Sequence, residues 1–253
     1  MKVISLCNSK GGVGKTTSVA HISAALVLSG KKVLMIDLDA NRSLSGFFKI
    51  NLDSVKDPLT AIDVISKPDR FTFKDAAIEV NSNLFLAPVK KNEANLYEHI
   101  FYNDKSTVMN LKKALSRVKD DFDYVLIDTP GSSHSVYIPM AIAASDQILV
   151  PIGQSDMDIE PTMAFISILD DIIEKYNKEL TDIRFMATKL KSKYQFKGVE
   201  KMFDGDEQSL LCKSFITHRV IFERTSSQGV TIIEADAENK GAKDYIKLAK
   251  EIM

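Results

Sequence analysis

The sequence predicts a doubly wound α/β fold, in which helices cover both faces of a mostly parallel sheet. Two observations support this prediction. Short apolar runs typical of buried strands alternate along the chain with longer segments of helical periodicity. Glycine and carboxylate motifs directly follow several of these runs, which places them at the carboxyl edge of such a sheet. With 253 residues, 45% of them hydrophobic, and no linker-like stretch, residues 1–253 are expected to form a single domain.

The first predicted strand and helix flank a glycine-rich loop. The apolar run at residues 3–7 precedes the loop, and a helical pattern begins near Lys15. The loop consists of Lys10, Gly11, Gly12, Val13, Gly14, Lys15, Thr16 and Thr17. Glycines let backbone N–H groups approach a phosphate, and the helix N-terminus adds the positive end of its dipole. In such a loop Lys15 would reach the β- and γ-phosphates, and the Thr16 hydroxyl would bind Mg²⁺.

The loop departs from the ordinary P-loop pattern in one informative way. That pattern requires glycine at position 9, whereas this chain has Ser9 followed by a second lysine, Lys10. The string Lys10–Thr16 resembles the deviant Walker A motif of the ParA/MinD family, KGGVGKT. The resemblance implies the P-loop NTPase fold, ATP as the nucleotide and Mg²⁺ as the metal.

A second predicted strand, at residues 33–36, ends in two carboxylates. Asp37 and Asp39 follow it directly, where ligand-binding residues are expected in a parallel sheet. An alternative is that both aspartates only cap the following turn. The corresponding motif of the family is DxDPQ, and Ala40 and Asn41 here replace its Pro and Gln. The resemblance implies that Asp39 orients the attacking water and that Asp37 supports the Mg²⁺ shell. It leaves the role of Asn41 open.

The rest of the chain continues the alternation, least regularly at residues 43–80. Further strands are expected at residues 83–88, 147–151 and 183–187, and further helices at residues 59–65, 95–101, 111–118, 163–173 and in the tail at 241–252.

One more apolar run, at residues 122–127, ends in Asp128-Thr129-Pro130-Gly131. A strand that ends in aspartate downstream of a P-loop has the Walker B arrangement, with the carboxylate of Asp128 one water away from the metal. Gly131 gives the backbone freedom to move near the γ-phosphate, as in switch loops.

The resemblance extends from residue 3 to residue 252 and assigns roles to matching positions. It implies ATP hydrolysis by in-line attack of water, with Lys10, Lys15 and Asp39 as the catalytic residues. The implied metal-binding residues are Thr16, Asp37 and Asp128. Thr188 and the loop after Pro151 are candidates to contact the adenine.

Lys10 carries the prediction about assembly. A lysine before a glycine loop is most often a solvated side chain, but in the family this lysine crosses to the partner's phosphates. The resemblance therefore implies a homodimer that closes over two ATP molecules and loosens after hydrolysis.

The charge distribution bears on DNA binding. Residues 184–224 contain nine lysines and arginines against five carboxylates, while the whole chain has a net charge of −1. A solvated face would explain this excess, but ParA proteins bind DNA without sequence preference through basic residues in this third of the chain. The residues expected to bind DNA are Lys189, Lys191, Lys193 and Arg219. Sequence-specific reading is not expected, because no helix-turn-helix-like extension precedes residue 1.

The resemblance also implies partners and a location. A ParB-like centromere-binding adaptor would stimulate hydrolysis, and the cargo would be a plasmid or a chromosome. We expect a cytoplasmic protein associated with the nucleoid.

Three other functions are open to this scaffold. MinD-like ATPases, which position cargo at a membrane, carry a basic amphipathic tail, whereas this chain stops at residues 251–253 and no membrane binding is expected. Iron–sulfur relatives require suitably placed cysteines, and the isolated Cys7 and Cys212 do not meet that requirement. A small-molecule ATPase or ligase is the third, and a test of DNA-stimulated hydrolysis would separate it from the partition function.

Overall fold

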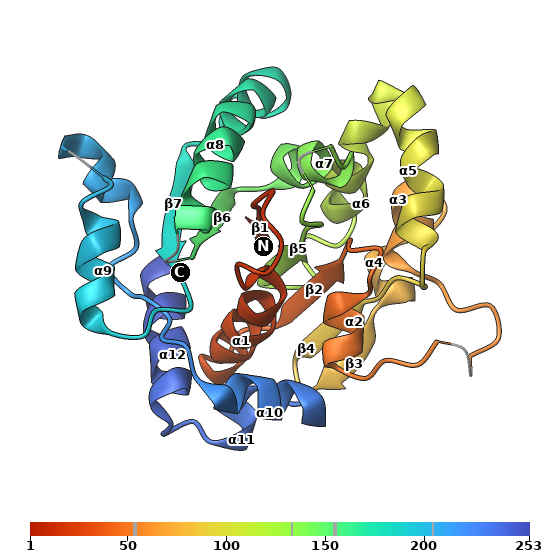
Figure 1. Cartoon of the computed structure of the whole chain (residues 1–253). Coiled ribbons are helices and arrows are strands. Elements are labelled where there is room, and N and C mark those ends of the chain that lie inside the picture. Colours follow the sequence, from red (N-terminus) through yellow and green to blue (C-terminus); the bar gives the residue numbers. More distant parts are fainter. Residues whose placement is uncertain (53–54, 133, 154–155, 204) are drawn as a thin grey trace.

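The computed structural model describes residues 1–52, 55–132, 134–153, 156–203 and 205–253; within these ranges the side chains of residues 156–161, 163 and 206 are not described. In this part of the chain, one seven-stranded sheet has the order β3-β4-β2-β5-β1-β6-β7 (Figure 1). The strands are β1 (Lys2–Leu6), β2 (Val33–Asp37), β3 (Ile78–Asn81), β4 (Leu84–Ala87), β5 (Tyr124–Asp128), β6 (Gln147–Ile152) and β7 (Asp182–Ala187).

The prediction of a mostly parallel sheet is confirmed. All neighbouring strands are parallel except β3, which pairs antiparallel with β4 through an irregular register at Glu79 and Asn81. The sequence did not predict β3, which falls in the irregular stretch 43–80. Its residues alternate between half-buried and exposed at the edge of the sheet, and glutamate and asparagine are poor strand formers.

Helices cover both faces of the sheet, as predicted (Figure 1). One face carries α1 (Lys15–Leu28), α2 (Ser43–Phe47), α10 (Val220–Gln228), α11 (Ile232–Ala235) and α12 (Lys240–Ile252). The other carries α3 (Ala61–Ser66), α4 (Phe73–Ala76), α5 (Glu93–Asn103), α6 (Asn110–Ser116), α7 (Tyr137–Ala144), α8 (Asp156–Tyr176) and α9 (Lys193–Glu200). The described residues also include two short 3₁₀ segments, η1 (Lys105–Met109) between α5 and α6, and η2 (Gly205–Leu210) between α9 and α10. Within the described residues no helix combines the length and apolarity needed to cross a bilayer.

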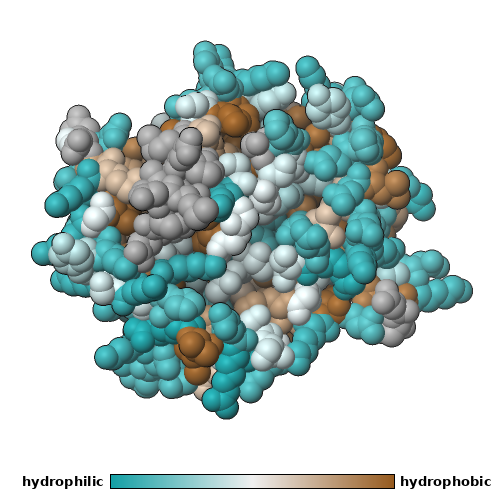
Figure 2. Space-filling model, in the orientation of Figure 1, coloured by the Kyte–Doolittle hydropathy of each residue, from teal (hydrophilic) through white to brown (hydrophobic). Residues whose placement is uncertain are grey.

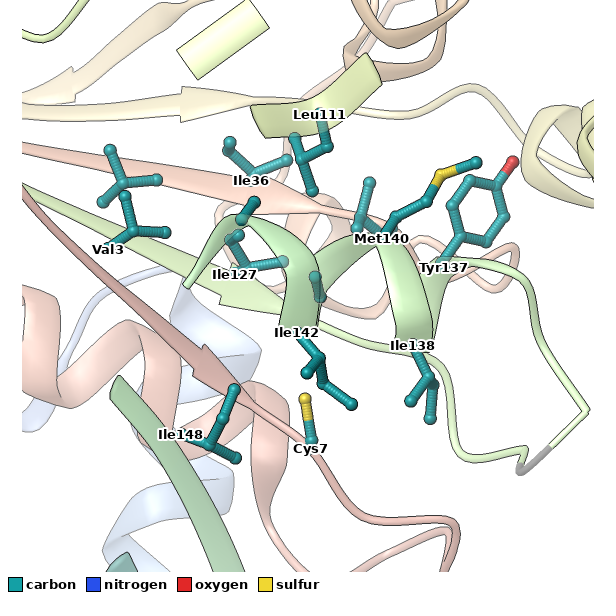
Figure 3. Close-up of a cluster of buried hydrophobic side chains, with 14 of the residues drawn as sticks. Val3, Cys7, Ile36, Leu111, Ile127, Tyr137, Ile138, Met140, Ile142 and Ile148 are labelled. Carbon is teal, nitrogen blue, oxygen red and sulfur yellow. The ribbon is translucent and has the colours of Figure 1, made fainter. Parts of the chain in front are cut away.

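The alternation of side chains along the strands produces two buried clusters, one on each face. In β1, Val3 belongs to the cluster beneath α7, whereas Ile4 and Leu6 belong to the cluster beneath α1. Figure 3 shows the first cluster, in which Val3, Ile36 and Ile127 of neighbouring strands gather with side chains of α7. The surface in Figure 2 is mainly hydrophilic, with apolar residues scattered over the viewed face.

Helix α7 was not predicted, and its burial explains why. Its sequence is almost entirely apolar, and seven of its eight residues are buried. A helix that is buried nearly all round shows no amphipathic period, so the pattern that reveals surface helices is missing. Pro139 lies in its first turn, where the absent N–H costs nothing.

The register of the three central strands positions the functional motifs. β5 lies between β1 and β2, and Asp128 at its end is the register partner of Leu6 on one side and of Asp37 on the other. The strand ends that carry the glycine loop and the two carboxylate motifs therefore lie side by side, as the sequence predicted.

A histidine is buried on the face covered by α1. His21 is fully buried and stacks on Tyr245 of α12 with 4.9 Å between ring centroids, while Phe222 and Phe47 contact it edge-on. Its Nδ1 donates to the Thr17 carbonyl oxygen at 2.7 Å, and its Nε2 has no hydrogen-bond partner among the described residues. Burial lowers the pKa of His21 to about 4, although the Thr17 carbonyl and the charge of Glu234 oppose the shift.

This histidine makes stability depend on pH. Between roughly pH 6.5 and 4 the unfolded chain binds a proton that the folded chain does not, so the free energy of unfolding decreases as the pH falls. Between pH 7 and 4.5 we expect His21 to account for a loss of about 2 kcal/mol. Urea unfolding at both pH values should show a loss smaller by that amount in His21→Phe. The exposed-site control His99→Gln should behave as wild type, and an identical pH dependence in His21→Phe would contradict the assignment.

Candidate functional site

The glycine loop between β1 and α1 has the backbone geometry of an anion site. Gly12 and Gly14 have φ angles of +79° and +93°, a conformation that residues with a Cβ rarely adopt. Gly11 and Gly12 are exposed, so their backbone is accessible to a ligand. The 14-residue helix α1 begins directly after the loop and directs its N-terminus toward it.

Lys15 lies beneath this loop rather than in solvent. Its side chain is buried, and its Nζ donates to the carbonyl oxygens of Asn8 at 2.9 Å and Lys10 at 3.0 Å. Burial lowers the pKa of Lys15, and the charge of Asp128 opposes this shift. An ammonium group held between two loop carbonyls is placed where phosphate oxygens could accept the same protons, and its role in binding phosphate stays a prediction.

Asn8 holds the start of the loop, and the sequence did not predict this. Its Nδ2 donates to the carbonyl oxygen of Pro151 at 2.8 Å and to Oγ1 of Thr162 at 3.0 Å, and its Oδ1 accepts from the backbone N–H of Lys10. The available signal was a polar residue, here fully buried, directly after a buried strand. The backbone of Lys10 is therefore fixed, while its side chain forms no ion pair with any described residue.

Thr16 and Asp128 form a pair of oxygen ligands at the foot of the loop. The Thr16 hydroxyl donates to Oδ2 of Asp128 at 2.7 Å, and Oδ1 of Asp128 is buried without a hydrogen-bond partner among the described residues. Burial, followed by the neighbouring charge of Asp37, raises the pKa of Asp128 well above its usual range. A divalent cation would satisfy the orphaned oxygen and stabilise the charged carboxylate.

These residues fit Mg²⁺ better than a metal that needs a full protein cage. Hydroxyl and carboxylate oxygens suit Mg²⁺, which usually keeps water and phosphate oxygens as its other ligands. Among the described residues there is no group of three or more His, Cys, Asp or Glu side chains that could hold an ion.

The predicted metal residue Asp37 is brought next to Asp128 but is engaged elsewhere. Its Oδ2 accepts from the N–H and the hydroxyl of Ser45 at 2.8 and 2.7 Å, and its Oδ1 accepts from the Asp39 N–H. Burial raises its pKa to about 6, against the opposing effect of the Ser45 hydrogen bonds. Asp37 thereby anchors α2, and a contact with Mg²⁺ through water stays a prediction.

Asp39 is oriented by two neighbours. Its Oδ1 accepts from the backbone and side-chain amides of Asn41 at 3.0 and 3.1 Å, and its Oδ2 accepts from the Ser43 hydroxyl at 2.8 Å. Asn41, whose role the sequence left open, therefore holds the Asp39 carboxylate in place. Asp39, Asn41 and Gly131 line one polar cavity with Asn95 and Glu98 of α5.

The loop after β5 touches the glycine loop. An added Cβ at Gly131 would lie 3.1 Å from the Gly11 Cα and 3.5 Å from Nζ of Lys15. Thr129 fixes the base of this loop, because its hydroxyl donates to the Leu6 carbonyl oxygen at 2.8 Å. Gly131 thus brings a backbone segment against Gly11 and Lys15 of the glycine loop.

A second cavity, of about 180 Å³, opens on the other side of the loop. Gly14, Thr17, Thr188, Lys189 and Arg219 contribute to its lining. The Thr188 hydroxyl donates to the carbonyl oxygens of Val13 at 2.8 Å and Ile152 at 3.2 Å. This residue, directly after β7, therefore holds the glycine loop in place. Residues 154 and 155 of the loop after Pro151, the other predicted adenine contact, lie outside the described residues.

The residues predicted to bind DNA lie in two settings. Lys189, Lys191 and Lys193 are exposed, and Lys193 begins α9. Arg219 is half-buried at the start of α10, and its Nε is buried without a hydrogen-bond partner among the described residues. The three lysines thus present charge to solvent, whereas the stem of Arg219 lies in the wall of the second cavity. Cys7 and Cys212 are both buried, and burial raises the pKa of each thiol to about 12.

The contact between the two loops makes Gly131 sensitive to substitution. Gly131→Ala should force the loop away from Gly11 and Lys15 and lower the rate of ATP hydrolysis about tenfold or more, because small displacements of reacting groups are costly. The matched control is Gly46→Ala in α2, where a Cβ meets no atom within 4 Å. Initial rates of phosphate release measure the effect, and equal rates in wild type and both variants would contradict it.

Comparison with known proteins finds relatives along the whole chain. A family model described as an AAA domain matches residues 1–182. The sporulation initiation inhibitor protein Soj of Bacillus subtilis is 27% identical over 256 residues, which span 99% of this chain and 98% of Soj. An uncharacterized protein of Mycobacterium tuberculosis is 30% identical over 261 residues, which span 100% of this chain and 78% of that protein.

Solved structures share the fold over the whole length. McdA of Cyanothece superposes with a TM-score of 0.84 at 23% identity, covering 99% of this chain and 98% of McdA. A plasmid partition protein of Borrelia burgdorferi, bound to AMPPNP, gives 0.77 at 22% identity, covering 99% and 98%. MinD of Aquifex aeolicus gives 0.76 at 22% identity, covering 100% and 97%. The motifs, the matched family model and the relatives along the full chain together show that this protein belongs to the ParA/MinD family of P-loop ATPases.

Proposed function

We propose that this protein is a ParA-type partition ATPase, with residues 1–253 as its single ATPase domain, in which bound ATP holds two copies together. The observation that carries the proposal is the different placement of the two loop lysines. Lys15 is buried under its own loop, whereas only the backbone of Lys10 is used there. The Lys10 ammonium is therefore free to contact the phosphates of a second subunit.

The proposed reaction is the hydrolysis of ATP to ADP and phosphate. Lys15 and the loop N–H groups bind the β- and γ-phosphates, and Asp39, held by Asn41 and Ser43, orients the water in line with the γ-phosphate. Mg²⁺, bound by Thr16 and Asp128, would offset the charge of the phosphates. Lys10 of the second subunit adds a positive charge. ATP attracts this charge more strongly than ADP does, because ATP carries the γ-phosphate.

We place the adenine and ribose in the second cavity. It borders Gly14 and Thr17 at the start of α1, on the side of the loop away from Asp39. A nucleotide lying across the loop would then reach from this cavity to the carboxylates. The AMPPNP bound to the Borrelia partition protein supports a nucleotide in this family of structures.

The cargo we propose is DNA, bound without sequence preference through Lys189, Lys191, Lys193 and Arg219. The three exposed lysines form no ion pair with a described carboxylate, so their charge is available to phosphates. A dimer doubles this basic surface, which links DNA affinity to ATP. The likeness of this chain to Soj and to the plasmid partition protein supports a role in partition. In this proposal a ParB-like centromere-binding adaptor stimulates hydrolysis, and the protein acts in the cytoplasm on the nucleoid.

A second candidate is an ATPase of the MinD or McdA kind that positions another cargo. The structural likeness to McdA and MinD supports this candidate, and the fold alone does not distinguish between the two kinds of cargo. The DNA measurement below separates the two.

Lys10→Ala should retain nucleotide binding but lose ATP-dependent dimerisation, because the loop's own contacts use only the backbone of Lys10. Light scattering with Asp39→Ala as the background, to slow hydrolysis, measures the dimer. The control is Lys178→Ala, on the loop between α8 and β7, at the end of the strands away from the glycine loop. Unchanged dimerisation of Lys10→Ala would refute the proposed assembly.

DNA affinity should depend on the nucleotide. With Asp39→Ala, we expect binding to non-specific DNA in ATP, at least about tenfold weaker binding in ADP, and a salt dependence whose log–log slope falls by about 0.9 for each phosphate contact removed. Lys189→Ala, Lys191→Ala and Lys193→Ala should weaken binding to all sequences alike, whereas the Lys178→Ala control should not. Equal affinity with ATP, with ADP and without nucleotide would leave an ATPase but remove the partition mechanism.

A further inference from the structure

An apolar cavity of about 280 Å³ lies apart from the nucleotide site, between α8, β7 and the segment around η2. Its floor consists of buried side chains, among them Ile152, Leu169, Phe185 and Phe203. This volume exceeds that of cavities known to hold one aromatic ring, and its apolar lining favours an apolar occupant. The proposed ATPase mechanism makes no use of it.

The mouth of the cavity has a different character from its floor. Asp170 of α8 and Glu207 of η2 are exposed there, and no lysine or arginine belongs to the described lining. Ile166 and Ile183 also line the cavity and are half-buried. An occupant would therefore bury an apolar group and meet two carboxylates at the rim, which favours a partner with positive charge beside the apolar group.

A hydrogen bond connects the cavity to the glycine loop. Thr162 lines the cavity and is buried, and its Oγ1 accepts from Nδ2 of Asn8 at 3.0 Å. The other atoms of Asn8 accept from the Lys10 N–H and from Nζ of Lys15. One residue thus separates the wall of the cavity from both lysines of the phosphate loop.

We propose that this cavity is a docking site for an apolar side chain presented by a basic segment of a partner protein, and that its occupancy changes ATP hydrolysis through Thr162 and Asn8. The first half stands on the cavity and its rim alone. The second half rests on the proposed ATPase function.

Docking is tested with the full-length protein and three short peptide probes. One has a phenylalanine between pairs of lysines, one replaces the phenylalanine with alanine, and one replaces the lysines with aspartates. The methyl NMR signals of Ile166 and Ile183 should shift when the first peptide binds, and the other two peptides should bind at least about tenfold more weakly. The methyl signals of Ile232, on the opposite face of the sheet, should not change. No shift, equal affinity for all three peptides, or equal affinity for the lysine and the aspartate peptide overturns the proposal.

Variants of the rim give an independent test. Glu207→Lys and Asp170→Lys should each weaken binding of the lysine–phenylalanine peptide, whereas the control Asp171→Lys, exposed on α8 but outside the cavity lining, should bind as wild type. Leu210→Phe, which enlarges a half-buried side chain in the lining, should block docking sterically. Wild-type binding by all of these variants would overturn the site.

The coupling is tested with Thr162→Val, which keeps the shape of threonine but removes its hydroxyl. In the wild type, the lysine–phenylalanine peptide should change the hydrolysis rate by about fivefold or more, and in Thr162→Val it should still shift the methyl signals without changing the rate. A rate effect that persists in Thr162→Val overturns the proposed route. If the wild type hydrolyses no ATP, the proposed function fails, and the methyl shifts still decide the docking site.

Discussion

The site depends on the burial of one ammonium group. Nζ of Lys15 draws the carbonyl oxygens of Asn8 and Lys10 toward itself, so that the loop closes around a cation. Burying this charge is costly, and the positive end of the α1 dipole adds to that cost, whereas the two carbonyl oxygens and the charge of nearby Asp128 offset it. A phosphate group would relieve that cost, which explains why a loop of this composition binds anions.

The parallel sheet sets the second constraint, because it concentrates carboxylates at one edge. Asp37 and Asp128 end adjacent strands, and burial raises the pKa of both. The two carboxylates differ in their hydrogen bonds. Both carboxylate oxygens of Asp37 accept hydrogen bonds, from Ser45 of α2 and from the Asp39 N–H, whereas Asp128 keeps one oxygen without a partner among the described residues. The first carboxylate is thus suited to hold structure and the second to bind a cation.

The sequence predicted the parts of this protein that follow a local rule. The glycine loop, the aspartates after strands and the helices that were predicted have short-range patterns, and each lies where it was expected. The helix α7 and the strand β3 escaped prediction, since the first is buried on all sides and the second is a polar edge strand. The helices α2, α4, α9, α10 and α11 were not predicted either, because each is too short to show a sustained helical period. The contacts of Asn8 with Pro151 and Thr162 span more than 140 residues, and no local pattern encodes such pairs. Arg219 shows the same limit, because local charge could not reveal that its stem is half-buried beside the loop.

The hydroxyl of Thr188 grips the carbonyl of Val13, and the next residue along the chain is Lys189, whose backbone has the left-handed φ of 57°. Consecutive α-carbons are about 3.8 Å apart and joined by a rigid peptide plane. A shift of the loop that carried Val13 with it would therefore turn the first lysine of the basic stretch without any intervening domain motion. The position of the glycine loop and the direction of the Lys189 side chain are therefore linked through one hydrogen bond and one peptide unit.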